Sequence, residues 1–189
     1  MLEGWNMISG MHKKTRTARR GISPRDAFTL IEILIVVTIL AIVATIVIPQ
    51  FSNASMTARE NMLRDELRYL RTQIIVYKAQ HHDVAPGYPG GDTTQAATET
   101  DFVSQMTKPT DEKGVTSASA SPVYKFGPYL SKMPENPITR FSAVLVIGDT
   151  DPWPTADGKV YGWFYRPITG DIMANSEGAD TQGTLFTTY

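Results

Sequence analysis

The sequence predicts an α+β fold in which a long N-terminal α-helix packs on a small antiparallel β-sheet. Three observations lead to this prediction. An apolar run of membrane length comes first, an amphipathic helical pattern follows it, and short strand-like segments separated by turns fill the rest. These observations divide the chain into four regions, residues 1–27, 28–48, 49–80 and 81–189.

The first region is basic, whereas the remainder of the chain is acidic. Residues 1–27 hold six Lys or Arg and two Asp or Glu, a net charge of 6 − 2 = +4, and residues 28–189 hold twelve and seventeen, a net charge of −5. Nucleic-acid binding by the acidic body is disfavoured, because neutralising phosphates needs an excess of Lys and Arg. The chain contains no Cys, which excludes a disulfide framework and a thiolate metal site.

Residues 28–48, FTLIEILIVVTILAIVATIVI, predict a transmembrane helix. Fifteen of these 21 residues are Phe, Leu, Ile or Val, and a helix of this length spans roughly 30 Å, the thickness of a bilayer core. The preceding basic residues keep residues 1–27 in the cytoplasm and send residues 49–189 across the membrane. A cleaved secretory signal has a shorter apolar region, about 7 to 15 residues, so a retained helix is favoured.

Residues 49–80 predict an amphipathic continuation of the same helix. One apolar stripe recurs at spacings of 4, 3, 4 and 3, and it consists of Leu63, Leu67, Leu70, Ile74 and Tyr77. The charged residues are expected on other faces, and they are Arg59, Glu60, Arg64, Asp65, Glu66, Arg68 and Arg71. Pro49 lacks an amide donor and crowds the preceding turn, so a local kink or opening is expected there. The stripe is expected to face a globular domain formed by residues 81–189.

Residues 81–189 are rich in turns, since they hold ten of the twelve Pro and eleven of the fourteen Gly. A short helix is predicted at residues 100–106, with Thr98 or Thr100 as its N-cap, and residues 108–122 read as an exposed polar loop. Strands are predicted at residues 142–147, 161–166 and 171–174, with the turn PITG between the last two. Four aromatic residues could form a binding patch, but aromatic residues in strands usually serve the core, which is the expectation for Trp153, Trp163, Phe164 and Tyr165.

The segment from Ala27 to Phe51, AFTLIEILIVVTILAIVATIVIPQF, resembles the N-terminus of type IV prepilins and of the pseudopilins of type II secretion systems. In that family a membrane-embedded prepilin peptidase cuts before the Phe and methylates the new α-amino group. The resemblance implies a leader peptide of residues 1–27, cleavage between Ala27 and Phe28, and N-methylation of Phe28. The residue before the cut is usually Gly, and we expect processing to survive with Ala27 in its place.

Glu32 is the one charged residue in the apolar run. In a lone membrane helix, an acid this near the end can snorkel to the interface at little cost. The resemblance implies another role, because in the family this glutamate pairs with the N-terminal amine of a neighbouring subunit and sets the axial register of a helical filament. The same resemblance suggests that the helix opens or bends at Pro49 during packing, and a passive kink stays open as the alternative.

Residues 126–137, FGPYLSKMPENP, resemble the segment that enters the sheet in the major pseudopilin of type II secretion, and residues 162–175, GWFYRPITGDIMAN, resemble a terminal hairpin found in many pseudopilin-like sequences. The resemblance implies a structural subunit held in the bacterial inner membrane, with a periplasmic C-terminal domain, before assembly into a pseudopilus. Its implied partners are further copies of the chain, prepilin peptidase, the inner-membrane assembly platform, a cytoplasmic ATPase, minor pseudopilins and membrane lipid. A type IV pilus subunit for adhesion, motility or DNA uptake stays open, as does an uncleaved membrane-anchored binding domain.

The sequence offers little support for catalysis or for a metal site. No nucleophile and base stand out as a pair, so an enzyme is not expected. His81 and His82 are adjacent, so on a helix they point about 100° apart and chelate poorly.

One loop bears on calcium. Residues 175–183, NSEGADTQG, resemble the calcium-binding loop of many major pseudopilins, with Asp180 as a ligand. An ordinary solvated loop stays open as the alternative, because calcium needs six or more oxygen ligands. No other cofactor is expected.

Overall fold

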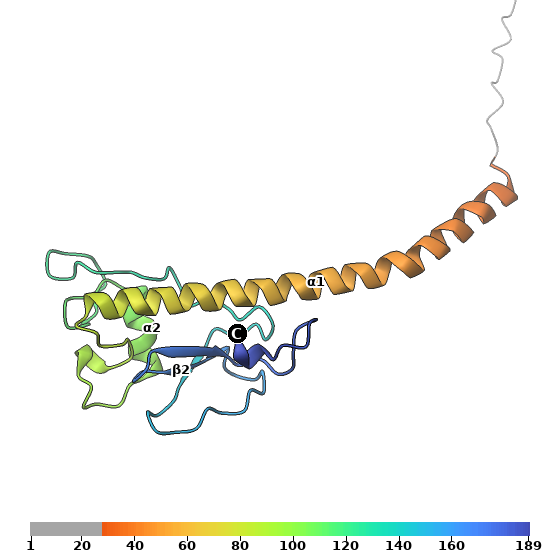
Figure 1. Cartoon of the computed structure of the whole chain (residues 1–189). Coiled ribbons are helices and arrows are strands. Elements are labelled where there is room, and N and C mark those ends of the chain that lie inside the picture. The colour runs from red at the N-terminus through yellow and green to blue at the C-terminus, as the bar shows by residue number, and fades with distance from the viewer. Residues whose placement is uncertain (1–27) are drawn as a thin grey trace, which may run out of the picture. The chain divides into compact units, whose positions relative to one another are not determined.

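The structure is a computed structural model that describes residues 28–189. Its elements follow in the order α1 (Leu30–Gln80), the 3₁₀ turn η1 (Pro89–Gly91), α2 (Glu99–Thr107), β1 (Val144–Val146), β2 (Trp163–Arg166), β3 (Asp171–Ala174) and the 3₁₀ turn η2 (Phe186–Thr188) (Figure 1). The predicted α+β class is confirmed. The chain divides into two compact units, of which the first ends at Ala44 and the second comprises Thr45–Tyr189.

Helix α1 unites the two predicted helical regions in one element of 51 residues, and the helix passes through Pro49. Within the second unit, its C-terminal part lies along the sheet and α2 (Figure 1). All five residues of the predicted stripe, Leu63 to Tyr77, are at most 1% exposed. Spacings of three and four residues place them on one face of a helix, which explains why they enter the core together.

The sheet has three strands in the order β1-β2-β3. Strands β2 and β3 are antiparallel and pair Trp163 with Ala174, as the predicted turn between them requires. Strands β1 and β2, however, are parallel and pair Val144 with Trp163, so the expectation of a wholly antiparallel sheet is wrong for this pair. The physical reason is the connection, because residues 147–162 form a long crossover instead of a tight hairpin turn.

The core of the second unit lies between α1, α2 and the sheet. Strand β2 contributes Trp163, Phe164 and Tyr165, each at most 2% exposed, so the expectation that they serve the core is confirmed. For Trp153 it is wrong, because this residue lies outside the strands and is only half-buried, beneath the Arg166 guanidinium. The Trp163 indole Nε1 donates a hydrogen bond to the Pro134 carbonyl at 2.9 Å, and the Tyr165 hydroxyl donates to the Pro86 carbonyl at 2.8 Å. These bonds satisfy the polar ends of the buried rings and attach two irregular segments to the sheet.

Helix α2 confirms the predicted short helix, and Thr98 is its N-cap. The Thr98 hydroxyl accepts a hydrogen bond from the Asp101 amide at 3.0 Å. The following residues 108–122 are mostly exposed, as expected, but Thr110 is fully buried. Its hydroxyl lies 3.0 Å from the Nε2 atom of His81, which couples this loop to the residue that follows α1.

Candidate functional site

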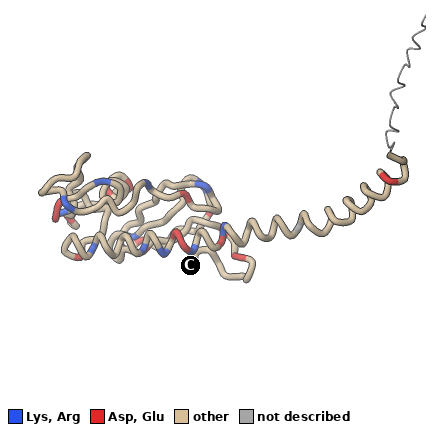
Figure 2. The backbone as a smooth tube through the Cα atoms, turned by 90° about the horizontal axis from the view of Figure 1, so that it is seen from above, with Lys and Arg blue, Asp and Glu red and all other residues tan. Residues whose placement is uncertain are grey.

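The N-terminal part of α1 is an apolar helix with an exposed surface. Between residues 28 and 58 the only charged residue is Glu32 (Figure 2). The large apolar residues of this stretch are all exposed, from 39% for Val47 to 86% for Leu30. By length and composition, this helix is long and apolar enough to cross a membrane. Its exposed apolar surface needs lipid or other protein around it, because water is an unfavourable environment for it.

Glu32 lies in the first turn of this helix and forms a capping box with Thr29, the residue before the helix. The Thr29 hydroxyl accepts a hydrogen bond from the Glu32 amide at 3.2 Å, and the Glu32 carboxylate accepts from the Thr29 amide and the Thr29 hydroxyl, each at 3.1 Å. Reciprocal bonds of this kind satisfy donors that the first turn of a helix leaves free. The pattern Thr-x-x-Glu before an apolar run is a recognised signal of a helix start, and the sequence reasoning missed it.

The other predicted processing and assembly positions are placed as follows. Phe28 is 79% exposed and precedes the first residue of α1 by two positions. Ala27, and with it one side of the predicted cleavage junction, lies outside the described residues. Pro49 lies inside α1, well beyond Glu32 along the same helix, and the opening of the helix there stays a prediction.

The predicted calcium ligand Asp180 belongs to the C-terminal segment, residues 175–189, where it binds other protein groups. One carboxylate oxygen, Oδ2, contacts the guanidinium of Arg64 on α1 and accepts a hydrogen bond from the Tyr189 hydroxyl at 2.7 Å. The other oxygen, Oδ1, accepts from the amides of Gln182 and Thr184, each at 2.8 Å. Asp180 therefore closes a turn within the segment and joins that turn to α1.

Two further groups of α1 hold the same segment. The Glu60 carboxylate accepts hydrogen bonds from the amide and the hydroxyl of Thr181 at 3.0 and 2.9 Å. Arg71 donates to the main-chain oxygens of Tyr189 and Ile172, the latter at 3.1 Å. Glu60 was expected on an outward face but is only 3% exposed, because the C-terminal segment covers it. We call Glu60, Arg64 and Arg71 with their partners Asp180, Thr181 and Tyr189 the C-terminal clasp.

Ionisation of the clasp follows from these contacts. The Tyr189 hydroxyl, the amides of residues 182 and 184, and the Arg64 guanidinium hold the pKa of Asp180 below its usual value, against the effect of burial. Burial, together with the hydrogen bond to Asp180, raises the pKa of Tyr189 to about 12. Burial lowers the pKa of Arg71. At neutral pH Asp180 is thus a carboxylate, Tyr189 a neutral phenol and Arg71 a guanidinium.

This set of groups does not fit a calcium ion. Calcium takes six to eight oxygen ligands, whereas both oxygens of Asp180 already accept protein hydrogen bonds and a guanidinium contacts one of them. Among residues 28–189, no group of three or more His, Cys, Asp or Glu side chains is placed to hold a metal ion. Calcium at Asp180 stays a prediction, and the clasp shows what occupies the carboxylate instead.

Comparison with known proteins gives one match. Residues 23–48 match the family model described as the prokaryotic N-terminal methylation motif. This motif marks a type IV prepilin-like N-terminus processed by a prepilin peptidase, and an apolar helix that carries it is consistent with membrane anchoring. Searches of curated proteins and of solved structures find no significant match. The match covers Glu32 and the apolar helix and ends just before Pro49.

Proposed function

We propose that this chain is a structural subunit of a type II secretion pseudopilus, cleaved before Phe28 and assembled into a helical filament. The observation that carries the proposal is the methylation motif at residues 23–48, which coincides with an exposed apolar helix. The function is assembly, with no catalytic step performed by the chain itself.

The apolar helix supports two successive states of such a subunit. Before assembly, lipid surrounds residues 28–48, and the charged second unit stays on the periplasmic side of the inner membrane. In the filament, the same surface packs against the helices of neighbouring copies, so protein contacts replace lipid contacts. A heterologous contact that repeats with a rotation that does not close generates a helical filament.

Glu32 acquires a specific partner in this proposal. Cleavage before Phe28 creates a positive α-amino group, and a carboxylate buried among packed helices needs a charged partner. The amine of a neighbouring copy supplies that partner and fixes the register between adjacent helices. The capping box with Thr29 holds Glu32 at the first turn of the helix until the neighbour arrives.

The choice of a pseudopilus over a pilus rests on resemblance within the second unit. Residues 162–175 form the β2–β3 hairpin, and this segment resembles the terminal hairpin of pseudopilin-like sequences. The proposed assembly depends on prepilin peptidase, an inner-membrane platform, a cytoplasmic ATPase and minor pseudopilins.

Deletion of the gene in the source bacterium, with complementation by the intact chain, tests the proposal. We expect proteins that normally reach the medium to accumulate in the periplasm, and surface pili and motility to be unchanged. Normal secretion with a loss of pili, motility or DNA uptake would instead identify a type IV pilus subunit. A matched strain that carries Glu32→Ala separates assembly from expression, because this variant is made and inserted but is expected to secrete poorly.

A further inference from the structure

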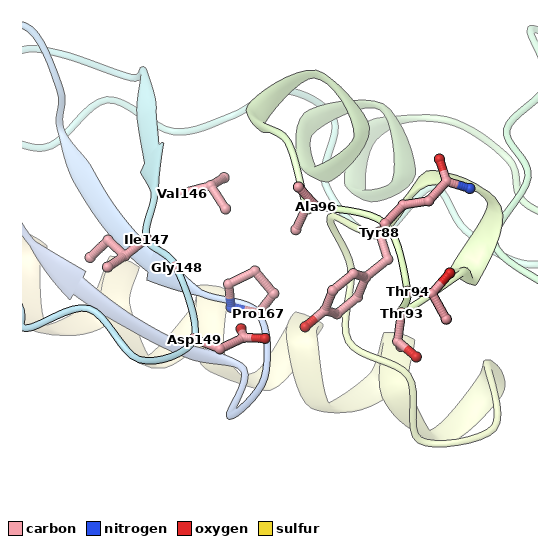
Figure 3. Close-up of a pocket in the computed structure, with 11 residues that line it drawn as sticks. Tyr88, Thr93, Thr94, Ala96, Val146, Ile147, Gly148, Asp149 and Pro167 are labelled. Carbon is pink, nitrogen blue, oxygen red and sulfur yellow. The ribbon is translucent and has the colours of Figure 1, made fainter.

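A polar cavity of about 450 Å³ lies on the second unit, far along the chain from the apolar helix. Tyr88, Thr93 and Ala96 line it on one side, and Val146, Asp149 and Pro167 line it on the other (Figure 3). An adjoining cavity of about 380 Å³ shares Tyr88, Thr93, Asp149 and Pro167 with it. A volume of this order is typical of small-molecule sites. The shared residues place one phenol and one carboxylate where the two cavities meet.

Tyr88 is the buried polar group at this place. Its side chain is only 6% exposed, yet its hydroxyl points into the cavity between Thr93 and Asp149 (Figure 3). Burial raises the pKa of the phenol, and the neighbouring Asp149 carboxylate raises it further. The phenol therefore stays protonated at neutral pH. Its hydroxyl faces Asp149 as a donor, and its oxygen lone pairs stay available to a second donor (Figure 3).

The charge of the cavity has one sign. Asp149 is exposed and takes part in none of the ion pairs among residues 28–189. Asp83 lines the adjoining cavity, and its carboxylate lies 3.6 Å from the Lys78 ammonium. Of the described residues that line the two cavities, none is Lys or Arg. An anion therefore finds no positive partner here, whereas a cation finds an unpaired carboxylate beside hydroxyl acceptors.

We propose that this cavity binds an alkyl ammonium group, with its positive end at Asp149 and Tyr88 and its alkyl stem against Val146 and Pro167. An ammonium has three donors and no acceptor, and the Asp149 carboxylate and the Tyr88 phenol oxygen offer acceptors on the same side of the cavity (Figure 3). A divalent metal ion fits less well, because hard cations need six or more oxygen ligands in a compact shell. The mixed lining of apolar and acceptor groups suits a stem that ends in a charge.

Two sources share this chemistry, a lysine side chain of another polypeptide and a free alkyl amine. The proposal does not depend on filament formation, so each can fail without the other. The probes are Nα-acetyl-lysine N-methylamide for the side chain and cadaverine for the free amine. Norleucine in the same amide form is the matched neutral probe, and arginine amide is the probe for a guanidinium.

The full chain, methyl-labelled at Ile and Val and held in detergent micelles, is titrated with each probe by NMR. We expect saturable shifts at the Val146 and Ile147 methyl groups with the ammonium probes and none with norleucine. Tighter binding of the lysine probe assigns the site to a polypeptide, and tighter binding of cadaverine assigns it to a free amine. Absence of saturation with both, equal binding of norleucine, or tighter binding of arginine amide overturns the proposal.

Variants locate the site. Asp149→Asn removes the charge at an exposed position, and we expect it to weaken ammonium binding at least about tenfold, the loss typical of a charge-assisted bond. Tyr88→Phe keeps the buried ring and weakens binding by a smaller factor. Glu135→Gln is the matched control, since it removes one exposed carboxylate outside both cavities and leaves binding unchanged. Equal affinity of Asp149→Asn and the unmodified chain excludes the proposed site.

Discussion

Glu60 on α1 accepts two hydrogen bonds from one residue of the C-terminal segment, the amide and the hydroxyl of Thr181, at 3.0 and 2.9 Å. The two residues are 121 positions apart in the chain. Their contact therefore fixes the C-terminal segment on α1, beside the Arg64–Asp180 pair. In the described residues, these contacts occupy the place for which the sequence suggested calcium.

Removal of the Glu60 carboxylate is expected to destabilise the second unit. Glu60→Ala leaves the donors of Thr181 without acceptors at a site that is 3% exposed, so the free energy of unfolding should fall by about 1–3 kcal/mol. Urea unfolding in micelles measures this loss. The matched control on the same helix is Asp65→Asn, because the Asp65–Arg68 pair is 3.8 Å long with both side chains 77% exposed and contributes under about 0.5 kcal/mol. Equal losses for the two variants would show that the clasp does not stabilise the fold.

Acid is expected to release the C-terminal segment before the rest of the fold. The pKa of Asp180 is lowered, chiefly by the Tyr189 hydroxyl, below the usual value of 3.8. The stabilisation is therefore fully present above pH 3.8 and is lost as the pH falls through the lower value of the folded protein. The measurement is amide hydrogen exchange from pH 5 to below pH 3.8. Release of the segment should appear as loss of protection at the Gln182 and Thr184 amides, which donate to Asp180.

Asp180→Asn serves as the companion variant for the acid experiment. It should expose the amides of residues 182 and 184 already at neutral pH and abolish their further response to acid. The Thr98 amide, which donates to the Gly87 carbonyl at 2.9 Å, is the internal reference and should keep its protection. Simultaneous loss of protection at all three amides would mean global unfolding and contradict a local release.

His81 is expected to make the free energy of unfolding depend on pH in a second range, which lies below pH 6.5. Its ring is 2% exposed, stacks on Tyr77 with ring centroids 3.8 Å apart, and donates from Nδ1 to the Tyr77 carbonyl at 2.7 Å. Burial lowers the pKa of His81 below 6.5, partly offset by that hydrogen bond. The unfolded chain thus binds more protons, so the free energy of unfolding falls as the pH decreases from 6.5 towards the lower pKa of the folded state.

Thermal unfolding across this window, with two histidine variants, checks the assignment. His81→Phe keeps an aromatic ring beside Tyr77 but cannot titrate, so this part of the pH dependence should disappear. His82→Asn should retain it, because the His82 side chain is 69% exposed and Asn accepts the positive φ of 53° at that position. Persistence of the full pH dependence in His81→Phe would assign it to another group.

Two variants separate the observed capping role of Glu32 from the assembly role that we propose for it. Glu32→Gln keeps the capping box, since Gln also serves at this position, but removes the charge that in the proposed filament pairs with the neighbouring amine. Thr29→Ala removes the cap, at a cost of about 1 kcal/mol to the helix start, and keeps the charge. We expect Glu32→Gln to reduce filament yield at least about tenfold and Thr29→Ala to reduce it far less, with yields measured by shearing and immunoblotting. The reverse order would assign Glu32 to helix capping alone.

The sequence predicts those features that depend on neighbours along the chain. The stripe from Leu63 to Tyr77, the Thr98 cap and the β2–β3 hairpin all follow from local spacing and turn residues. The parallel direction of β1 depends on the path of residues 147–162, which local patterns do not encode. The burial of charged residues on α1 likewise could not be predicted from local sequence. Glu60, Arg64 and Arg71 look like solvated residues until the C-terminal segment covers them.

The candidate site also contains residues that the sequence predicts and contacts that only the fold reveals. Phe28 and Glu32 are predictable because the methylation motif is a continuous stretch of sequence. The pairing of Asp180 with Arg64 could not be predicted in this way, because the two residues lie 116 positions apart and only the fold brings them together. The capping role of Glu32 could have been predicted from Thr29, three residues earlier in the chain.

Processing at Phe28 is the central claim, and mass analysis of the N-terminus tests it most directly. The full chain is expressed with and without a prepilin peptidase, and the N-terminal peptide is identified by tandem mass spectrometry. We expect a mature chain that begins at Phe28 and carries one methyl group on its α-amino nitrogen, only when the peptidase is present. Ala27→Gly should be cleaved at the same bond and at least as fast. A chain that keeps residues 1–27 in both conditions, or one that begins elsewhere, would contradict the account.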